Sequence, residues 1–567
     1  MNRIKIFLLA TLLIVAAGCE DFLDINRDPN NPSEPDMQLL LPGIQKTIGN
    51  IFSLDFGSVG YAMAVFTHQL STRQPEYDGY GIAGSSFAVT YWNDFYAGAL
   101  RGNFNAGAMQ NIELLISEAE ESGNTHYEGI GKTLKAYVYS TMVDIWGDIP
   151  YSEANIKGNN HPVFDDDEAI YADLLVLLDS AYNDLKTEPT DLRSVGGDDI
   201  IYKGDITKWI KANRTIKLKL YTQVRKHAMF NQTAVNELIA NQAELISSWT
   251  ESFIIPTDST SNPDNRNRGF VSEYGGGQIS NYISPWFYEI MTGENPTIFH
   301  GLRDPRIPYY FVNQKINGAP SQASGLVDYR NGDFISIYFG STGPNRDHAG
   351  RGTFTMMGIY PVGGKYDNGT AAPGAGLTSA HGTGAAPVRL LTYADRLYLE
   401  AELIITGKAT GDVEEKFSTA LVESFNQVDE VVALVQSPAP VPSIVEDTIA
   451  EAHIAEVRKL FTAASDERKL EIIMTQKWIS SWGGAHHDQY TDYRRTGYPV
   501  IFDPARPDHA PGGFVSGGPD GSGPVPVQRT RDYPLSWPYD TDELTLNNNA
   551  PDQKNITTSR VFWDVVK

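Results

Sequence analysis

The chain of 567 residues contains a single cysteine, Cys19, and this feature limits how its fold can be held together. One thiol cannot form a disulfide within the chain, and it cannot supply the several sulfur ligands of a zinc or iron–sulfur site. A chain of this length can instead bury one large apolar core or several smaller ones. The composition is 41% hydrophobic and 20% charged, which excludes an extensively disordered chain.

The cysteine follows a segment typical of a secretory signal peptide. Basic residues near the start precede an apolar run over residues 6–15, and small residues occupy positions 16–18. This run is well short of the roughly twenty apolar residues that a membrane-spanning helix needs. We predict a signal peptide over residues 1–18 and no transmembrane helix in the mature chain.

The four residues Ala16 to Cys19 resemble a bacterial lipobox, in which the cysteine becomes the lipid-modified first residue of the mature protein. Acyl chains would anchor Cys19 at roughly 0.8 kcal/mol per buried methylene. The alternative is a plain signal peptide cut near Gly18, with an incidental cysteine. The acidic, Asn- and Pro-rich residues that follow predict a flexible tether over 19–36 and a single folded body over 37–567.

Acidic residues directly after such a cysteine resemble the surface-export signal of Bacteroidetes lipoproteins. This resemblance implies a body held at the outer membrane by its lipid alone and exposed on the cell surface. Lys and Arg total 45 against 70 Asp and Glu, so the chain carries a net charge of −25. Such a surface repels phosphate backbones, and we expect no nucleic-acid partner.

Apolar residues recur at helical spacing through much of the body. One stripe runs from Leu134 to Ile145 and is ended by Gly147, and a second runs from Ile170 to Leu185. Further helices are predicted over residues 88–122, 206–227, 232–246, 391–407, 412–428, 444–463 and 466–482. Paired helices joined by short Gly-containing turns predict tetratricopeptide-like hairpins stacked as a scaffold, and hence a mainly α fold.

The acidic run from Asp165 to Glu168 invites a metal-site interpretation, which we reject. Asp165 precedes the second stripe, and Glu168 three residues later completes a pattern like a capping box. We therefore expect a helix start there, with neither a metal nor a cofactor bound.

The segment from about 250 to 390 differs in kind, because it is rich in Gly, Asn, Pro, Ser and aromatic residues and contains little helical periodicity apart from about 284–293. Long irregular segments in a compact protein are usually functional when they are ordered. We expect a loop-rich insert with minor β hairpins that forms the ligand-binding face on the helical scaffold.

Several ordered motifs resemble the SusD/RagB family of Bacteroidetes outer-membrane nutrient-binding lipoproteins, in particular the SusD-like branch with an Arg-Arg-Thr-Gly-Tyr-Pro motif. The resemblance covers nearly the whole chain. The matching pieces are Asp24-Ile25-Asn26, Asp144 to Tyr151, Gly204 to Trp209, Asp304-Pro305-Arg306, Gln476-Lys477-Trp478 and Asp492 to Pro499. One departure is His486 to Tyr490, where the family usually has Glu-Ala-Trp or a similar triplet.

The resemblance implies a body of four tetratricopeptide-like helix pairs and a binding role without catalysis. It also implies a partner, a SusC-like TonB-dependent outer-membrane transporter, to which the lipoprotein delivers its nutrient.

A saccharide site needs rings that pack on the C–H faces of sugars beside polar groups that bind hydroxyls. Two stretches of the sequence have this composition, and Trp92 is preferred because family members place ligand residues in the corresponding early loop. Each ring has an alternative role in core packing or in contact with the transporter. The predicted ligand-binding residues are Arg73, Tyr77, Asp78, Tyr80, Trp92, Asn93, Tyr282 and Trp286.

Arg494 and Arg495 permit an anion clamp, but we expect them to hold helix ends and carboxylates such as Asp492. Adjacent residues His486 and His487 cannot both face one site on a helix, and the chain has no HExxH motif. We therefore predict a binding protein with no catalytic residues, which captures oligosaccharide for the transporter. The alternatives are a peptide carrier, a surface hydrolase and a structural adaptor.

Overall fold

The structure of the protein, a computed structural model, describes most of the predicted body. The described residues are 36–74, 77, 80, 86–96, 107–276, 279, 281–319, 329–340, 352–501, 513–515, 525–527 and 533–565. The predicted signal peptide, Cys19 and nearly all of the predicted tether lie outside them.

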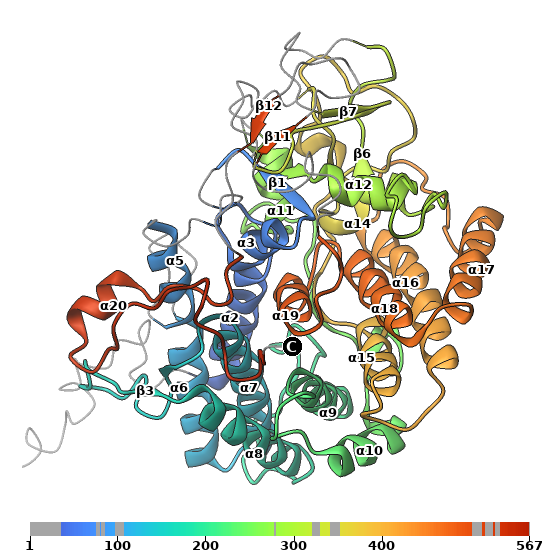
Figure 1. Cartoon of the computed structure of the whole chain (residues 1–567). Helices are drawn as coiled ribbons and strands as arrows, with labels where there is room; N and C mark the ends of the chain where they lie inside the picture. The colour runs from blue at the N-terminus through green and yellow to red at the C-terminus, as the bar shows by residue number, and fades with distance from the viewer. Residues whose placement is uncertain are drawn as a thin grey trace, which may run out of the picture.

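The N-terminal part of the body is helical, and its helices lie along the left and lower sides of Figure 1. Its first described helix begins at Met37, where Asp36 accepts a hydrogen bond from the backbone N–H of Gln38 and caps the helix. The helices of this part are α2 (Met37–Ile51), α3 (Val59–Phe66), α5 (Ser86–Phe95), α6 (Ala108–Ser122), α7 (Thr125–Trp146), α8 (Asp167–Leu185), α9 (Ile206–Gln223) and α10 (Gln232–Ala240).

The C-terminal part adds further helices: α15 to α18 lie on the right of Figure 1, α19 lies near the centre, and α20 lies on the left. Thr392 and Asp395 form a reciprocal capping box at the start of this group. The helices are α15 (Tyr393–Ile405), α16 (Val413–Val435), α17 (Thr448–Thr462), α18 (Asp466–Ser480), α19 (His486–Thr496) and α20 (Thr541–Leu546).

Neighbouring helices pack as hairpins, which agrees with the predicted scaffold. The most extensive contacts join α7 to α6 and α8, and α15 to α16. Two glycines allow α7 to approach both neighbours closely. A Cβ on Gly129 would lie 2.7 Å from Leu185 Cγ on α8, and a Cβ on Gly131 would lie 2.7 Å from Ile116 Cγ1 on α6.

Short strands accompany the loops of the 250–390 segment and its surroundings. All six pairs formed by the described strands are antiparallel and two-stranded. Three pairs join consecutive strands, as minor hairpins do, and the other three join strands that are distant in the sequence. The strands are β1 (Leu70–Thr72), β2 (Ile149–Pro150), β3 (Phe164–Asp165), β4 (Phe253–Ile255), β5 (Asn281–Ile283), β6 (Phe311–Val312), β7 (Tyr329–Asn331), β8 (Phe334–Ser336), β9 (Met356–Met357), β10 (Val388–Leu391), β11 (Gly513–Val515) and β12 (Val525–Val527).

The loop-rich segment also holds short helices, which lie at the top of Figure 1. The predicted helix at 284–293 is confirmed as α12. Pro285 occupies the first turn of α12, and Gly293 ends the helix in a left-handed conformation. The helical elements here are α11 (Arg268–Phe270), the π-helical turn Val271–Gly275, α12 (Pro285–Thr292), α13 (Ile307–Tyr310) and α14 (Ile359–Val362).

Two sequence expectations need correction. The predicted helix over 88–122 is two helices, α5 and α6, with residues 97–106 outside the described chain. The cap of α8 is Asp166, one residue later than predicted. Asp165 is occupied elsewhere, because its carboxylate accepts hydrogen bonds from the backbone N–H groups of Tyr151 and Ser152.

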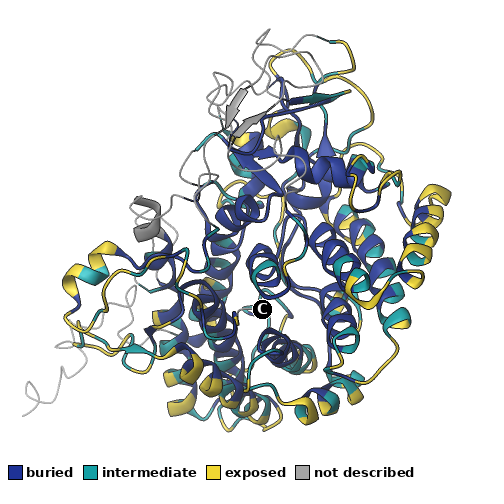
Figure 2. Ribbon diagram, in the orientation of Figure 1, coloured by how far each residue is buried: buried dark blue, intermediate teal, exposed yellow. Residues whose placement is uncertain are grey.

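Burial divides the molecule into a sealed interior and exposed outer helix faces, as Figure 2 shows. The motif tryptophans Trp146, Trp209 and Trp478 are at most 1% exposed and belong to the core. None of the helices in the described ranges has the length and apolar character needed to cross a membrane.

Candidate functional site

The two stretches of predicted ligand residues lie next to each other, although about 200 residues separate them in the sequence. Strand β1 pairs with β5, and the register places Ser71 opposite Tyr282 and Thr72 opposite Asn281. Tyr61 on α3 donates a hydrogen bond from its hydroxyl to Thr72 Oγ1 at 2.5 Å and so fixes the end of β1. The β1–β5 pair therefore brings the early loop and the loop-rich segment into one region.

Near the β1–β5 strand pair, tyrosine hydroxyls form hydrogen bonds with each other or with a histidine. The hydroxyl of Tyr91 donates to that of Tyr77 at 2.8 Å, and the Tyr80 hydroxyl lies 2.8 Å from His68 Nε2. The His68 ring stacks on Phe339 with 3.7 Å between centroids. Burial lowers the pKa of His68 to about 3, which keeps its ring neutral.

Trp92, the preferred ring, lies on α5 and is only 3% exposed. Its ring packs edge-on against Trp146 with centroids 5.3 Å apart and stacks with Phe164 at 6.0 Å. These contacts favour a packing role for Trp92 over a sugar-stacking one. Asn93, the next residue of α5, is half-buried.

The rings of the second stretch are also enclosed. Tyr282 is fully buried and contacts Phe354 edge-on at 4.8 Å between centroids. Trp286 on α12 is 2% exposed, and its indole N–H donates to the Val500 carbonyl at 3.1 Å. Both side chains thus serve core packing in this structure.

Among the predicted ligand residues that the structure describes, Arg73 and Asn93 are the two with partial exposure, whereas the rings are buried. Asp78 lies outside the described residues, as does the lipidation candidate Cys19. Ligand contact at each of these positions stays a prediction.

The Arg-Arg-Thr-Gly-Tyr-Pro segment has a structural role that the sequence anticipated. Arg494, in the last turn of α19, donates to the Leu535 carbonyl at 2.7 Å and to the Asp144 carbonyl at 2.5 Å. Its guanidinium carbon lies 4.0 Å from the centroid of the Tyr490 ring. Arg494 thereby ties the C-terminal end of α7 to the segment after residue 533.

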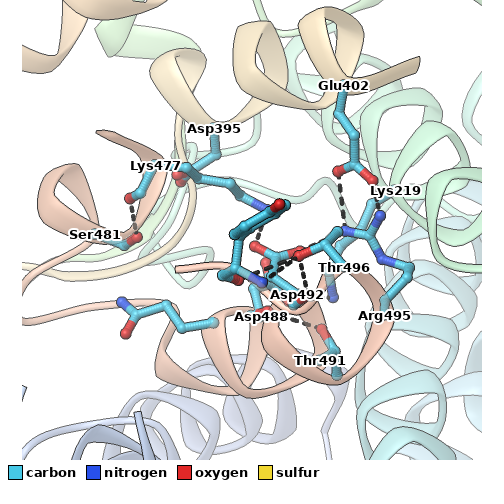
Figure 3. A network of polar contacts seen from close by, with 12 residues as sticks. Lys219, Asp395, Glu402, Lys477, Ser481, Asp488, Thr491, Asp492, Arg495 and Thr496 are labelled. Atoms are coloured by element: carbon cyan, nitrogen blue, oxygen red, sulfur yellow. Dashed lines mark hydrogen bonds and ion pairs between the residues drawn. The ribbon is translucent and has the colours of Figure 1, made fainter. Parts of the chain in front are cut away.

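Arg495 points into the interior, where it binds two carboxylates (Figure 3). Its Nη2 donates to Asp492 Oδ1 at 2.6 Å and to Glu402 Oε2 at 2.9 Å. Glu402 also accepts from Arg225 Nε at 2.5 Å. One carboxylate of α15 therefore holds an arginine that closely follows α9 and an arginine of α19.

Two lysines complete this buried charge cluster. Lys477 Nζ lies 2.7 Å from Asp492 Oδ2, and Lys219 Nζ lies 2.8 Å from Asp488 Oδ1. Four cations and four carboxylates thus balance, and each member is at most 7% exposed. The members are Lys219, Arg225, Lys477, Arg495, Asp395, Glu402, Asp488 and Asp492.

Enclosure and neighbouring charges shift the pKa values of carboxyl groups in the cluster. Burial raises the pKa of Asp492 to about 6, despite the attraction of Lys477. Burial also opposes ionisation of Asp488, yet Lys219, His487 and Lys477 together hold the pKa of Asp488 below its ordinary value. The members come from α9, α15, α18, α19 and the residues just after α9. All are enclosed and every cation has a carboxylate partner, so the cluster offers no surface to a ligand.

The structure also contains a pocket that the sequence did not predict. It has a volume of about 480 Å³ and lies where α2 meets β4 and β10. Lys46 reaches its wall and donates to Asn265 Oδ1 at 2.7 Å, while Ile255 and Val388 supply apolar surface. No motif marked this pocket, because its residues come from segments that are far apart in the sequence.

A comparison with family models assigns most of the chain. Residues 29–512 match the SusD-like model described as starch-binding associating with outer membrane. No match was found among curated proteins.

Solved structures share this fold at low sequence identity. A SusD homologue from Bacteroides fragilis has a TM-score of 0.63 and 18% identity, covering 94% of this chain and 99% of its own. A chitin-binding SusD homologue from Flavobacterium johnsoniae has a TM-score of 0.57 and 18% identity, covering 93% and 96%. The helical hairpins, the order of the motifs and the match over 29–512 lead to one conclusion: the chain belongs to the SusD-like family of starch-binding, outer-membrane-associated proteins.

Proposed function

We propose that this protein is a cell-surface lipoprotein that captures an oligosaccharide and delivers it to a SusC-like TonB-dependent transporter. The observation that carries the proposal is the family match over residues 29–512, whose description combines starch binding with the outer membrane. One structural neighbour is a chitin-binding protein, which agrees with a saccharide ligand. The protein binds its ligand without changing it.

The junction of β1 and β5 is the proposed place of capture. Arg73 directly follows β1, and Asn93 lies on α5; both are half-buried. Guanidinium and amide groups form paired hydrogen bonds with sugar hydroxyls. The buried tyrosines around them supply a rigid support.

Calorimetric titration of the full chain in detergent with maltohexaose, chitohexaose and mixed peptides tests the ligand class. We expect saccharide binding that weakens at least tenfold in Arg73→Ala and stays unchanged in Lys459→Ala, a control that removes an exposed cation from α17. Binding of peptides alone would replace the saccharide by a peptide cargo. Conversion of any saccharide would contradict the absence of catalysis.

The membrane attachment and the partner are tested in cells. We expect Cys19→Ala to leave the body folded and to release it from washed outer membranes, because the anchor is a lipid. We also expect a TonB-dependent barrel to co-purify with the wild-type protein. Retention of Cys19→Ala in membranes that lack the barrel would refute the lipid anchor.

A further inference from the structure

Trp249 differs from every other tryptophan of the chain. All nine tryptophans lie in described residues; eight are at most 3% exposed, and Trp249 alone is partly exposed. It begins the short 3-10 helix η2 (Trp249–Glu251), between α10 and β4. Within the described chain its ring contacts no other aromatic ring, and its indole N–H has no hydrogen-bond partner.

Trp249 lines an open groove with a volume of about 550 Å³. This volume lies within the roughly 300–1,000 Å³ of small-molecule sites. Tyr393, the first residue of α15, is a second partly exposed ring in the groove. The Trp249 groove therefore presents two rings on the helical scaffold. None of its lining residues belongs to β1 or β5.

The ring positions are fixed by the backbone around them. The N–H of Tyr393 donates to Ser252 Oγ at 3.1 Å, and Thr392 caps the same helix. Trp249 packs on one side against the apolar core. Rigid rings lose little conformational entropy when a ligand packs on them.

Helix α16 supplies the polar side of the groove. Glu423 and Asn426 lie one turn apart, and Asn426 Nδ2 donates to Glu423 Oε1 at 3.0 Å. Glu430, one turn after Asn426, is exposed. Burial raises the pKa of Glu423, and the nearby Glu430 adds to this shift. Ser248 also lines the groove, and its hydroxyl lies 3.1 Å from Thr250 Oγ1.

These groups suit a sugar with free hydroxyls. Carboxylates accept hydrogen bonds from hydroxyl groups, amides both accept and donate them, and the C–H face of a sugar ring packs on indole. No lysine or arginine lines the groove, so it repels acidic ligands. A cationic peptide is the competing occupant, but its attraction to carboxylates weakens with salt, whereas hydrogen bonding and stacking of a neutral sugar do not.

We infer that the Trp249 groove is a second saccharide site, which binds a neutral oligosaccharide on the helical scaffold. The inference rests on the proposed function for its ligand class, and on the isolated exposure of Trp249 for its position. A second site on the same body would raise the avidity for a long glycan, because two linked contacts dissociate less readily than one.

The position of Trp249 gives a selective readout. Acrylamide quenches exposed indoles, and Trp249 is the partly exposed member of the nine. We expect saturating maltohexaose or chitohexaose to protect the quenchable fluorescence of the full chain in detergent. The protectable fraction should vanish in Trp249→Phe, while Lys459→Ala keeps it. Protection should persist in 0.5 M salt, the concentration chosen for the assay.

Titration of the same variants separates the two proposals. Trp249→Ala should lower the saccharide affinity of one class of sites at least tenfold or abolish that class. Arg73→Ala should leave the protection of Trp249 intact. Saccharide binding with unchanged affinity and no protection of Trp249 would overturn the groove but keep the proposed function. Protection by a lysine-rich peptide alone, lost in salt, would also overturn the groove as a saccharide site. Failure of the wild type to bind any saccharide would overturn both.

Discussion

The buried charge cluster and the Trp249 groove both place carboxylates close to aromatic rings, yet they have opposite chemistry. In the cluster, Glu402 alone binds two arginines and is fully buried. In the groove, the carboxylates of Glu423 and Glu430 have no cation among the lining residues, whereas Asp429 accepts hydrogen bonds from Ser443, Ile444 and Val445. The same residue types therefore stabilise the fold in one place and remain accessible in the other.

This difference shows that a residue's role depends less on its type than on whether its hydrogen bonds and charge are already satisfied within the protein. Trp478 lies beside the cluster on α18 and donates its indole N–H to the Thr67 carbonyl at 3.1 Å. Trp249 makes no such bond within the described residues. An enclosed, paired group has little left to offer a ligand, whereas an open, unpaired group keeps its capacity.

The largest expected effect comes from removing a carboxylate of the cluster. Glu402→Ala leaves Arg225 and Arg495 buried without their shared partner, and it should lower the free energy of unfolding by about 5 kcal/mol. Glu430→Ala, in the groove, should change it by less than about 0.5 kcal/mol. Urea unfolding followed by circular dichroism measures both. Equal shifts of the two midpoints would break the comparison.

The same comparison made with two tryptophans should give a slightly smaller effect on the free energy of unfolding. Trp478→Ala creates a cavity in a sealed region and should cost about 4 kcal/mol of unfolding free energy. Trp249→Ala removes a ring that is packed on one side only, so about 1 kcal/mol is expected. The same unfolding experiment applies. A loss at Trp249 as large as that at Trp478 would show that this ring belongs to the core.

The smallest effect concerns pH. Burial lowers the pKa of His487 to about 3 from its ordinary 6.5, so the folded state excludes a proton that the unfolded state accepts. The free energy of unfolding is therefore not reduced by this group above pH 6.5. It falls by about 1.4 kcal/mol per pH unit well below pH 6.5, until the pH approaches 3.

We expect the stability difference between wild type and His487→Gln to shrink by about 1.4 kcal/mol between pH 5.5 and 4.5. Ser248→Ala in the groove removes no titratable group, so its difference from wild type should not change with pH. Urea unfolding at a series of pH values measures both differences. A constant difference for His487→Gln would show that water reaches the cluster.

Much of the scaffold could be predicted because helix formation is recorded locally. The stripe from Leu134 to Ile145 became α7, and Gly147 ended it as expected. The structural role of Arg494 and Arg495 was also predicted, since the nearby carboxylate of Asp492 offers an arginine a strong hydrogen-bond partner. Helix α19 was missed, because its eleven residues carry many polar groups that are buried only by the surrounding helices.

The candidate site was less predictable. Trp92 and Tyr282 stand in stretches rich in rings and polar residues, but the packing of distant segments encloses both. Trp249 stands just before the loop-rich segment, in no recognisable motif. Its exposure results from the way η2, α15 and α16 come together, which no local pattern records.

The sequence by itself determined the helical scaffold, the family motifs and the acidic charge, because spacing and composition are local properties of the chain. Tertiary structure alone decided which rings are sealed, which carboxylates are paired and where β1 meets β5. Burial and pairing depend on residues hundreds of positions apart, such as Arg225, Glu402 and Arg495, and only the folded chain brings them together.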